Sequence, residues 1–211
     1  MKMDSKVERY WDMRAQTWKH TLDTSIFATT EADTQIFKEF AAKDERGLLR
    51  DTLVLGATRT LCEIPSLHTA SIDISSGMLE NNIDPSKGIL AFHDTWENSH
   101  LHCRDIVNVL GCGSFNCLTL AQYGPVLESL CKTGATHLII RYYTQEKMAE
   151  HQAKLTTPAV ADEVDIADGV KYSFLREEDF IRRMQNGNFS LTESTIPHGG
   201  YFPIFHFTRS L

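Results

Sequence analysis

Short apolar runs that alternate with helical segments restrict the fold of this sequence more than any other feature. From residue 51 onward these runs recur, and most of them end at a glycine or an aspartate. Runs this short are typical of strands that are buried on both faces of a parallel sheet. The predicted strands cover residues 52–55, 69–72, 88–92, 105–110 and 137–143. Because helical patterns separate them, we expect a doubly wound α/β sheet.

The C-terminal part of the sequence has a different pattern. A helix is predicted over 177–185, and it precedes two strands over 189–196 and 201–208. The linker between these strands is Pro197-His198-Gly199-Gly200, and a short linker of this kind favours an antiparallel hairpin. The expected fold class is therefore a Rossmann-like, doubly wound, mostly parallel seven-stranded sheet with a C-terminal antiparallel hairpin.

The N-terminal part is predicted to be helical. Tyr10, Trp11, Arg14 and Trp18 fall at helical spacing, and a second helix is predicted over 31–42. We expect residues 1–45 to form a helical cap on a single domain that covers residues 1–211.

Composition and charge argue against several partners. The net charge is −7 and no basic block occurs, so the surface repels a phosphate backbone and nucleic acid is not expected as a partner. No apolar run approaches the roughly 20 residues of a membrane span, so no membrane partner is expected. The five cysteines form no CxxC pair, and His100, His102 and Cys103 lack a second ligand cluster. We therefore expect reduced thiols, no metal and a cytoplasmic location, and a homodimer remains open.

Two residues at predicted strand ends suggest a nucleotide site. Gly56 follows the first strand, where a residue without a Cβ allows close approach of a ligand. Asp73 ends the second strand, where a carboxylate can accept hydrogen bonds from both ribose hydroxyls. Ser75 is expected to cap the following helix. Ligands of open α/β sheets bind beyond these carboxyl ends.

With these elements the chain resembles the class I S-adenosylmethionine-dependent methyltransferases from about Tyr10 to its end. The matching segments are 10–15, 54–58, 71–79, 93–96 and 111–114. One departure is that Gly56 stands alone where the family usually carries several glycines.

The resemblance implies S-adenosylmethionine as cofactor and a set of site residues. Asp94 would read the adenine amino group, and Arg14 would pair with the methionyl carboxylate. The implied cofactor-binding residues are Gly56, Ala57, Thr58, Asp73, Ile74, Met78, Asp94, Thr95, Trp96, Gly111, Tyr10 and Arg14. The candidate substrate-binding residues are Ser114, Asn116, Arg141, Tyr143 and His198. Residues 142–179 are expected to help form the acceptor pocket.

The function expected from this resemblance is methyl transfer to a small-molecule acceptor. No catalytic residue is predicted, because the sulfonium is already activated and the protein has mainly to align the reactants. Other chemistry on the same cofactor, such as its cyclisation, and a non-catalytic binding protein with the same fold remain alternatives. A nicotinamide-dependent oxidoreductase is disfavoured, since the sequence has no GxGxxG loop after the first strand.

Overall fold

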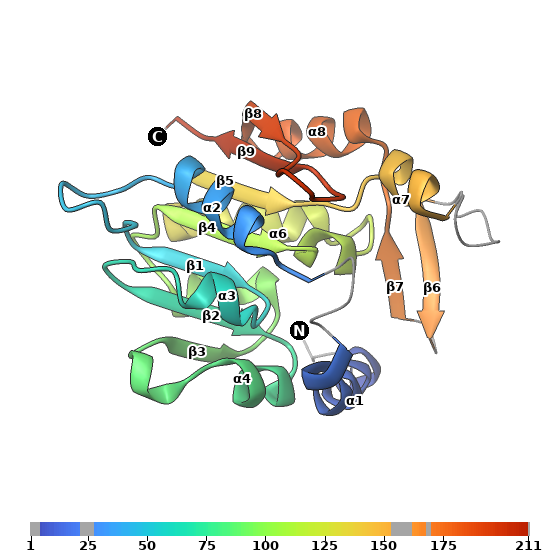
Figure 1. Cartoon of the computed structure of the whole chain (residues 1–211), viewed down its shortest axis with the longest axis horizontal. Coiled ribbons are helices and arrows are strands. Elements are labelled where there is room, and N and C mark those ends of the chain that lie inside the picture. The colour runs from blue at the N-terminus through green and yellow to red at the C-terminus, as the bar shows by residue number, and fades with distance from the viewer. Residues whose placement is uncertain (1–4, 22–27, 153–161, 168–169, 211) are drawn as a thin grey trace.

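The computed structural model describes residues 5–21, 28–152, 162–167 and 170–210, and its centre is a seven-stranded sheet (Figure 1). The strand order is β3-β2-β1-β4-β5-β9-β8, with the first five strands parallel. β9 runs antiparallel to β5 and to β8, so the predicted sheet with a C-terminal hairpin is confirmed. The strands are β1 (Thr52–Leu55), β2 (Thr69–Asp73), β3 (Leu90–His93), β4 (Asn108–Cys112), β5 (His137–Arg141), β8 (Ser190–Thr195) and β9 (Ile204–Thr208).

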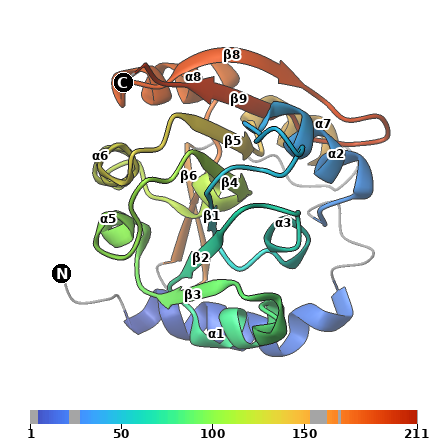
Figure 2. The ribbon, with the colours of Figure 1, turned by 90° about the vertical axis from the view of Figure 1, so that its left-hand side faces the viewer.

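Helices cover both faces of the sheet (Figure 2). Side chains of successive strand residues point to opposite faces. In β1, Leu53 and Leu55 therefore join the core that includes Val126 of α6, whereas Val54 joins the core that includes Phe37 of α2. The α-helices are α1 (Ser5–Thr21), α2 (Glu31–Phe40), α3 (Arg59–Cys62), α4 (Ser76–Asn82), α5 (Ser99–His102), α6 (Tyr123–Thr133), α7 (Gln145–Gln152) and α8 (Glu177–Asn186).

Local sequence signals set several helix ends. The Ser75 side chain accepts a hydrogen bond from the N–H of Met78 and caps α4, as predicted. Gly134 ends α6 with a φ of 94°, a left-handed conformation that glycine adopts without strain. Thr30 and Asp33 form a reciprocal capping box at the start of α2. The helix ends at Phe40, two residues before the predicted end at Ala42.

Two predicted strands begin three residues later than expected. β4 starts at Asn108 instead of 105, because Asp105 has a φ of 58° and the N–H of Ile106 bonds to Thr133 outside the sheet. β9 starts at Ile204 instead of 201. Pro203 directly precedes it, and a proline has no N–H to donate to a ladder.

A small second sheet was not predicted. β6 (Glu163–Ala167) and β7 (Val170–Ser173) form an antiparallel pair. The pair stands beyond the carboxyl ends of the parallel strands (Figure 1), and β7 contacts both α1 and the turn of 3-10 helix Ser114–Cys117 that follows β4. Residues 153–161, part of the predicted acceptor segment, lie outside the described residues. Among the described residues, no helix combines the length and apolar character needed to cross a membrane.

A histidine pair between β5 and β9 makes the fold sensitive to acid. Nδ1 of His137 lies 3.0 Å from Nε2 of His206, the rings stack on each other, and Phe40 stacks on His206. Burial lowers the pKa of both imidazoles below the ordinary value, and Arg50 also lowers that of His137, whereas Glu193 opposes the shift at His206. The folded state therefore resists protonation that the unfolded state accepts.

We expect the free energy of unfolding to fall as the pH drops below the ordinary histidine pKa of about 6.5. Urea denaturation at pH 7.5 and 5.5 measures this difference, and His137→Gln should reduce it. His198→Gln, at an exposed turn position, serves as the control and should leave it unchanged. An equal loss of stability in His137→Gln and the native protein would contradict the assignment.

Candidate functional site

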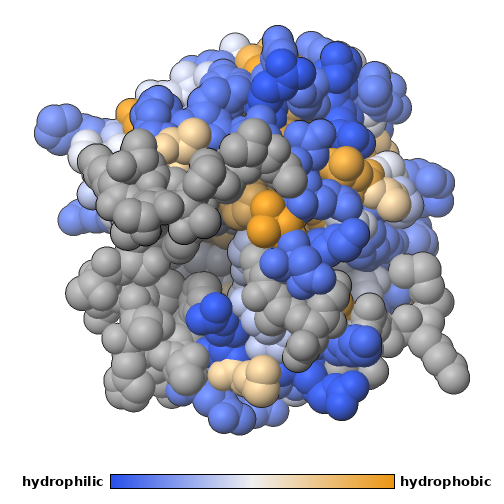
Figure 3. All heavy atoms as spheres, turned by 90° about the vertical axis from the view of Figure 1, so that its right-hand side faces the viewer, coloured by the Kyte–Doolittle hydropathy of each residue, from blue (hydrophilic) through white to orange (hydrophobic). Residues whose placement is uncertain are grey.

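A cavity of about 890 Å³ opens at the carboxyl ends of the parallel strands. It lies where the chain leaves β1 and β4 in opposite directions, which is the usual ligand position in open α/β sheets. Figure 3 looks onto this end of the molecule and shows hydrophobic side chains near the middle of the face, among hydrophilic ones. The predicted site residues that line the cavity are Tyr10, Arg14, Gly56, Ala57, Thr58, Asp73, Ile74, Met78, Thr95, Trp96, Ser114 and Tyr143.

Asp73 is the buried carboxylate of this cavity. Its side chain is 7% exposed, and each oxygen accepts one backbone N–H, from Ala57 at 2.8 Å and from Ser75 at 2.8 Å. Burial raises the pKa of Asp73 to about 6, against the lowering effect of these two hydrogen bonds. A carboxylate oxygen accepts more than one hydrogen bond, so Asp73 retains capacity for a ligand hydroxyl.

The loop after β1 leaves room directly beside Asp73. Gly56 has a φ of 82°, and a Cβ at this position would lie 3.8 Å from Asp73, Ser114 and Trp96. The indole N–H of Trp96 donates to the carbonyl of Ile72, which fixes the ring at the cavity wall. Ser114 donates to the carbonyl of Leu55 and so joins the turn after β4 to β1.

Helix α1 closes one side of the cavity through Asp12. The Asp12 carboxylate accepts hydrogen bonds from the Ser75 hydroxyl at 2.6 Å and from the Gly77 N–H at 3.1 Å. Tyr10 and Arg14 lie on the same helix, and Nε of Arg14 donates to the Tyr10 hydroxyl at 3.2 Å. No sequence pattern distinguished Asp12, because its position is defined by Ser75 and Gly77 at the start of α4. Trp18 belongs to α1, but its side chain lies outside the described residues.

Asp94 and Gly111 do not line the cavity. The Asp94 carboxylate accepts hydrogen bonds from His102 at 2.8 Å, from Asn98 at 2.8 Å and from the Thr95 N–H. Although partial burial acts to raise it, these hydrogen bonds hold the pKa of Asp94 below its ordinary value. A Cβ at Gly111 would lie 2.9 Å from Ile140, so this glycine is required by packing within the sheet.

Three candidate substrate residues, Asn116, Arg141 and His198, also lie outside the cavity lining. The Asn116 amide donates to the carbonyls of Tyr143 and Ser173 and accepts the Tyr143 N–H, so this buried side chain connects three segments. His198 is exposed in the turn between β8 and β9. Asn116 therefore supports the cavity wall, and His198 has no part in that wall.

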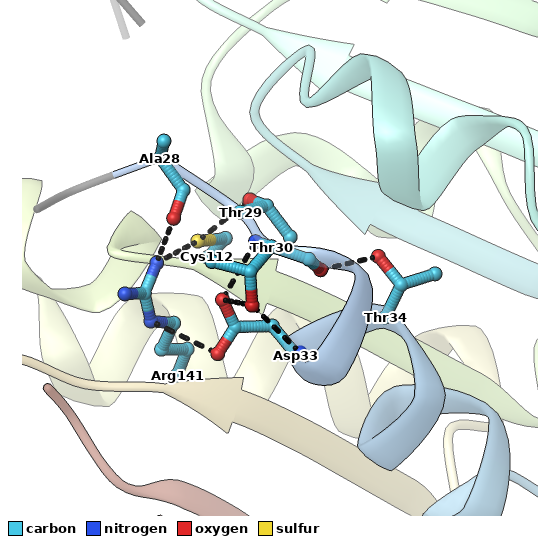
Figure 4. Close-up of polar contacts among 7 residues, drawn as sticks. All are labelled: Ala28, Thr29, Thr30, Asp33, Thr34, Cys112 and Arg141. Carbon is cyan, nitrogen blue, oxygen red and sulfur yellow. Dashed lines mark hydrogen bonds and ion pairs between the residues drawn. The ribbon is translucent and has the colours of Figure 1, made fainter. Parts of the chain in front are cut away.

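Arg141 lies behind the cavity in a buried polar cluster (Figure 4). Its side chain is 1% exposed, and its NH1 group donates to the carbonyl of Ala28 at 2.8 Å. Nε lies 3.6 Å from the Asp33 carboxylate, and the Thr29 hydroxyl donates to the sulfur of Cys112. Because Ala28, Thr29 and Cys112 line the cavity and Arg141 does not, the guanidinium fixes a wall of the cavity from behind.

Residues that the sequence analysis did not name form much of the remaining lining, together with Tyr143. We call this part the aromatic half, and it consists of Cys117, Tyr143, Met148, Val164, Tyr172 and Phe174. Tyr172 stacks on Trp11 of α1 with ring centroids 6.1 Å apart, and Phe174 meets Tyr172 edge-on. The alternation of Val164, Val170, Tyr172 and Phe174 with polar residues was a signal for these strands.

Comparison with known proteins relates this geometry to a fold. No protein-family model matches the chain, and no curated protein matches it either. Solved structures do match. The CcbJ methyltransferase from Streptomyces caelestis aligns with a TM-score of 0.70 and 10% identity over 97% of this chain and 99% of its own.

Two further solved structures agree. The 1,6-didemethyltoxoflavin-N1-methyltransferase of Burkholderia thailandensis aligns with a TM-score of 0.66 and 10% identity, over 98% of this chain and 89% of its own. An S-adenosylmethionine-dependent methyltransferase from Clostridium acetobutylicum aligns with a TM-score of 0.63 and 14% identity, over 96% of this chain and 98% of its own. The chain has the class I methyltransferase fold. In this methyltransferase fold the cavity described above lies at the carboxyl edge of the sheet, between α1 and the β6–β7 pair.

Gly113 offers a test of the cavity wall in this methyltransferase fold. Its φ is 66°, and a Cβ would lie 2.6 Å from the Tyr143 hydroxyl. Gly113→Ala should lower the free energy of unfolding by about 2 kcal/mol or more, from the left-handed backbone and the displaced ring.

Gly124→Ala is the matched control, because it lies in α6 with open space around its Cβ position. This change should leave stability equal or raise it by up to about 1 kcal/mol. Urea denaturation measures both variants. Equal stability of the two would contradict the close approach of the Tyr143 ring to the Cβ position of residue 113.

Proposed function

We propose that this chain binds S-adenosylmethionine and transfers its methyl group to a small-molecule acceptor. The observation that carries the proposal is the buried Asp73 carboxylate, which faces a cavity beside Gly56 at the edge of a class I methyltransferase fold. Neighbours with this fold include complexes with S-adenosylmethionine or S-adenosylhomocysteine. A cavity of about 890 Å³ is also large enough for a cofactor and an acceptor together.

In this proposal the strand-end residues hold the cofactor. Asp73 accepts hydrogen bonds from the ribose hydroxyls, and Thr95 and Trp96 lie against the adenine. Arg14 on α1 pairs with the methionyl carboxylate. The remaining contacts come from Tyr10, Gly56, Ala57, Thr58, Ile74 and Met78, which also line the cavity. Asp94 positions this wall through Thr95, since it does not line the cavity itself.

The bound cofactor supplies a sulfonium whose methyl group is already activated for transfer. The protein has to align the attacking atom of the acceptor with that methyl group and exclude water. Helix α1, held by Asp12 to the start of α4, covers one side of the cavity. Ser114 and Tyr143 border the acceptor, while Arg141 and Asn116 fix the segments around it.

The Asp73 assignment predicts a loss of cofactor affinity on substitution. Asp73→Asn keeps the shape of the side chain and one acceptor oxygen but removes the charge. Binding of S-adenosylhomocysteine should weaken about tenfold to a hundredfold, as expected for lost hydrogen bonds to a charged group. Isothermal titration measures this, with Asp84→Asn, a residue outside the cavity lining, as the control. Unchanged affinity in a folded Asp73→Asn protein would refute the assignment.

The raised pKa of Asp73 predicts a pH dependence of binding. Ribose hydroxyls donate to the ionised carboxylate, and the pKa of about 6 means that protonation competes with binding below pH 6. Affinity for S-adenosylhomocysteine should be constant above pH 7 and fall by about tenfold at pH 5. Asp73→Asn should lack this decrease, and near-UV circular dichroism at pH 5 confirms that the fold persists. A pH-independent affinity in the native protein would argue against the ribose contact.

A further inference from the structure

The charged residues of the cavity lining all precede β4 in the chain. The charged lining residues that the structure describes are Arg14 of α1, Arg59 of α3, Asp73 of β2 and Glu97 of the 3-10 turn after β3. From Cys112 to the end of the chain, every described lining residue is uncharged. The aromatic half therefore offers no counter-charge to an ionic acceptor, and an unpaired buried charge is strongly disfavoured.

Arg141 does not alter this conclusion, although it lies against a ring of the aromatic half. It lies beneath the ring of Tyr143, with the guanidinium carbon 5.7 Å from the ring centroid, and it is 1% exposed. Its charge faces Asp33, and its NH1 group is bonded to the carbonyl of Ala28. Tyr143 thus separates Arg141 from the cavity.

The aromatic half also has no evident proton acceptor. Burial raises the pKa of the Cys117 thiol to about 12 and the pKa values of the Tyr143 and Tyr172 phenols above their ordinary range. These groups are neutral near pH 7, so they can donate hydrogen bonds but do not remove a proton from an acceptor. The described lining residues of this half include no carboxylate and no imidazole.

The aromatic half offers ring faces and aliphatic groups to a ligand. Tyr172 and Trp11 lie nearly parallel at 14°, Tyr143 is tilted against Phe202 at 4.5 Å, and Met148 and Val164 complete the apolar surface. Aromatic faces attract both planar rings and cations. A positive charge that forms on a ligand here would therefore be stabilised without a carboxylate.

We infer that the acceptor is an uncharged aromatic molecule that attacks through a neutral nitrogen lone pair and leaves as a methylated cation. This inference rests on the proposed function. The nitrogen forms a bond to the methyl carbon, the carbon–sulfur bond breaks, and its electron pair remains on sulfur as a thioether. The positive charge passes from sulfur to nitrogen, and no proton has to move.

Three bicyclic probes of similar shape test the inference. Isoquinoline presents a neutral nitrogen, 2-naphthol requires loss of a proton before it reacts well, and 2-naphthoate is an anion at pH 7.5. Each is titrated against the native protein with and without S-adenosylhomocysteine, and methylated products are measured by mass spectrometry with S-adenosylmethionine. We expect isoquinoline to bind at least tenfold more tightly than 2-naphthoate and to yield N-methylisoquinolinium at a rate that does not change between pH 7 and 9.

Substitution of Tyr172 tests where the probe binds. Tyr172→Leu should weaken isoquinoline binding about threefold to tenfold, in line with the loss of one aromatic contact. Tyr201→Leu is the matched control, because Tyr201 is 50% exposed and lies outside the cavity lining. Equal binding by both variants would overturn the assignment of the ring to the aromatic half.

Other outcomes separate this inference from the proposed function. If S-adenosylhomocysteine binds but 2-naphthoate is preferred, or if no probe binds, the acceptor class is wrong while the cofactor assignment stands. Methylation of 2-naphthol in preference to isoquinoline, with a rate that rises with pH, would also overturn it. If S-adenosylhomocysteine does not bind, the proposed function fails, and isoquinoline binding to the protein alone still reports on the aromatic half.

Discussion

The architecture of the site depends on the two backbone hydrogen bonds that the Asp73 carboxylate accepts. One of its oxygens accepts the Ala57 N–H from the loop after β1, and the other accepts the Ser75 N–H at the start of α4. Ser75 in turn donates to Asp12, which brings α1 over the cavity. One buried anion thus joins the ends of two parallel strands, a helix N-terminus and the covering helix. Removing its charge should therefore affect both ligand affinity and the position of α1.

A second buried charge organises the opposite wall. Arg141 at the end of β5 connects to the Ala28 carbonyl and faces Asp33, whose other oxygen takes part in the capping box of α2. A buried guanidinium is tolerated only where its charge and donors have partners. The segment before α2 is thereby held against the strand ends, and Ala28 and Thr29 become part of the cavity lining. The two buried charges therefore have different roles. Asp73 faces the proposed cofactor, and Arg141 fixes the wall of the space beside it.

The contrast between the two halves of the cavity gives the site its chemical character. Backbone donors and charged side chains surround the strand-end residues, whereas the aromatic half consists of rings, one thiol, one thioether and an aliphatic group. A cationic sulfonium is compatible with both environments, because carboxylates and aromatic faces each attract cations. The reaction that we propose keeps one positive charge in the cavity throughout, so it needs no new charge to be buried.

The sequence by itself determined the sheet, its hairpin and the position of Asp73, because strand burial, helix caps and strand-end residues are local signals with a fixed period. Only the tertiary structure decided which side chains face the cavity. Asn116 and Arg141 are residue types that often bind ligands. Here their side chains donate to the carbonyls of Ser173 and Ala28, so they stabilise the cavity wall. Tyr172 reaches the cavity, and Asp12 reaches the start of α4, because α1 and β7 pack across the strand ends. Such contacts join residues far apart in the chain, so no local pattern encodes them.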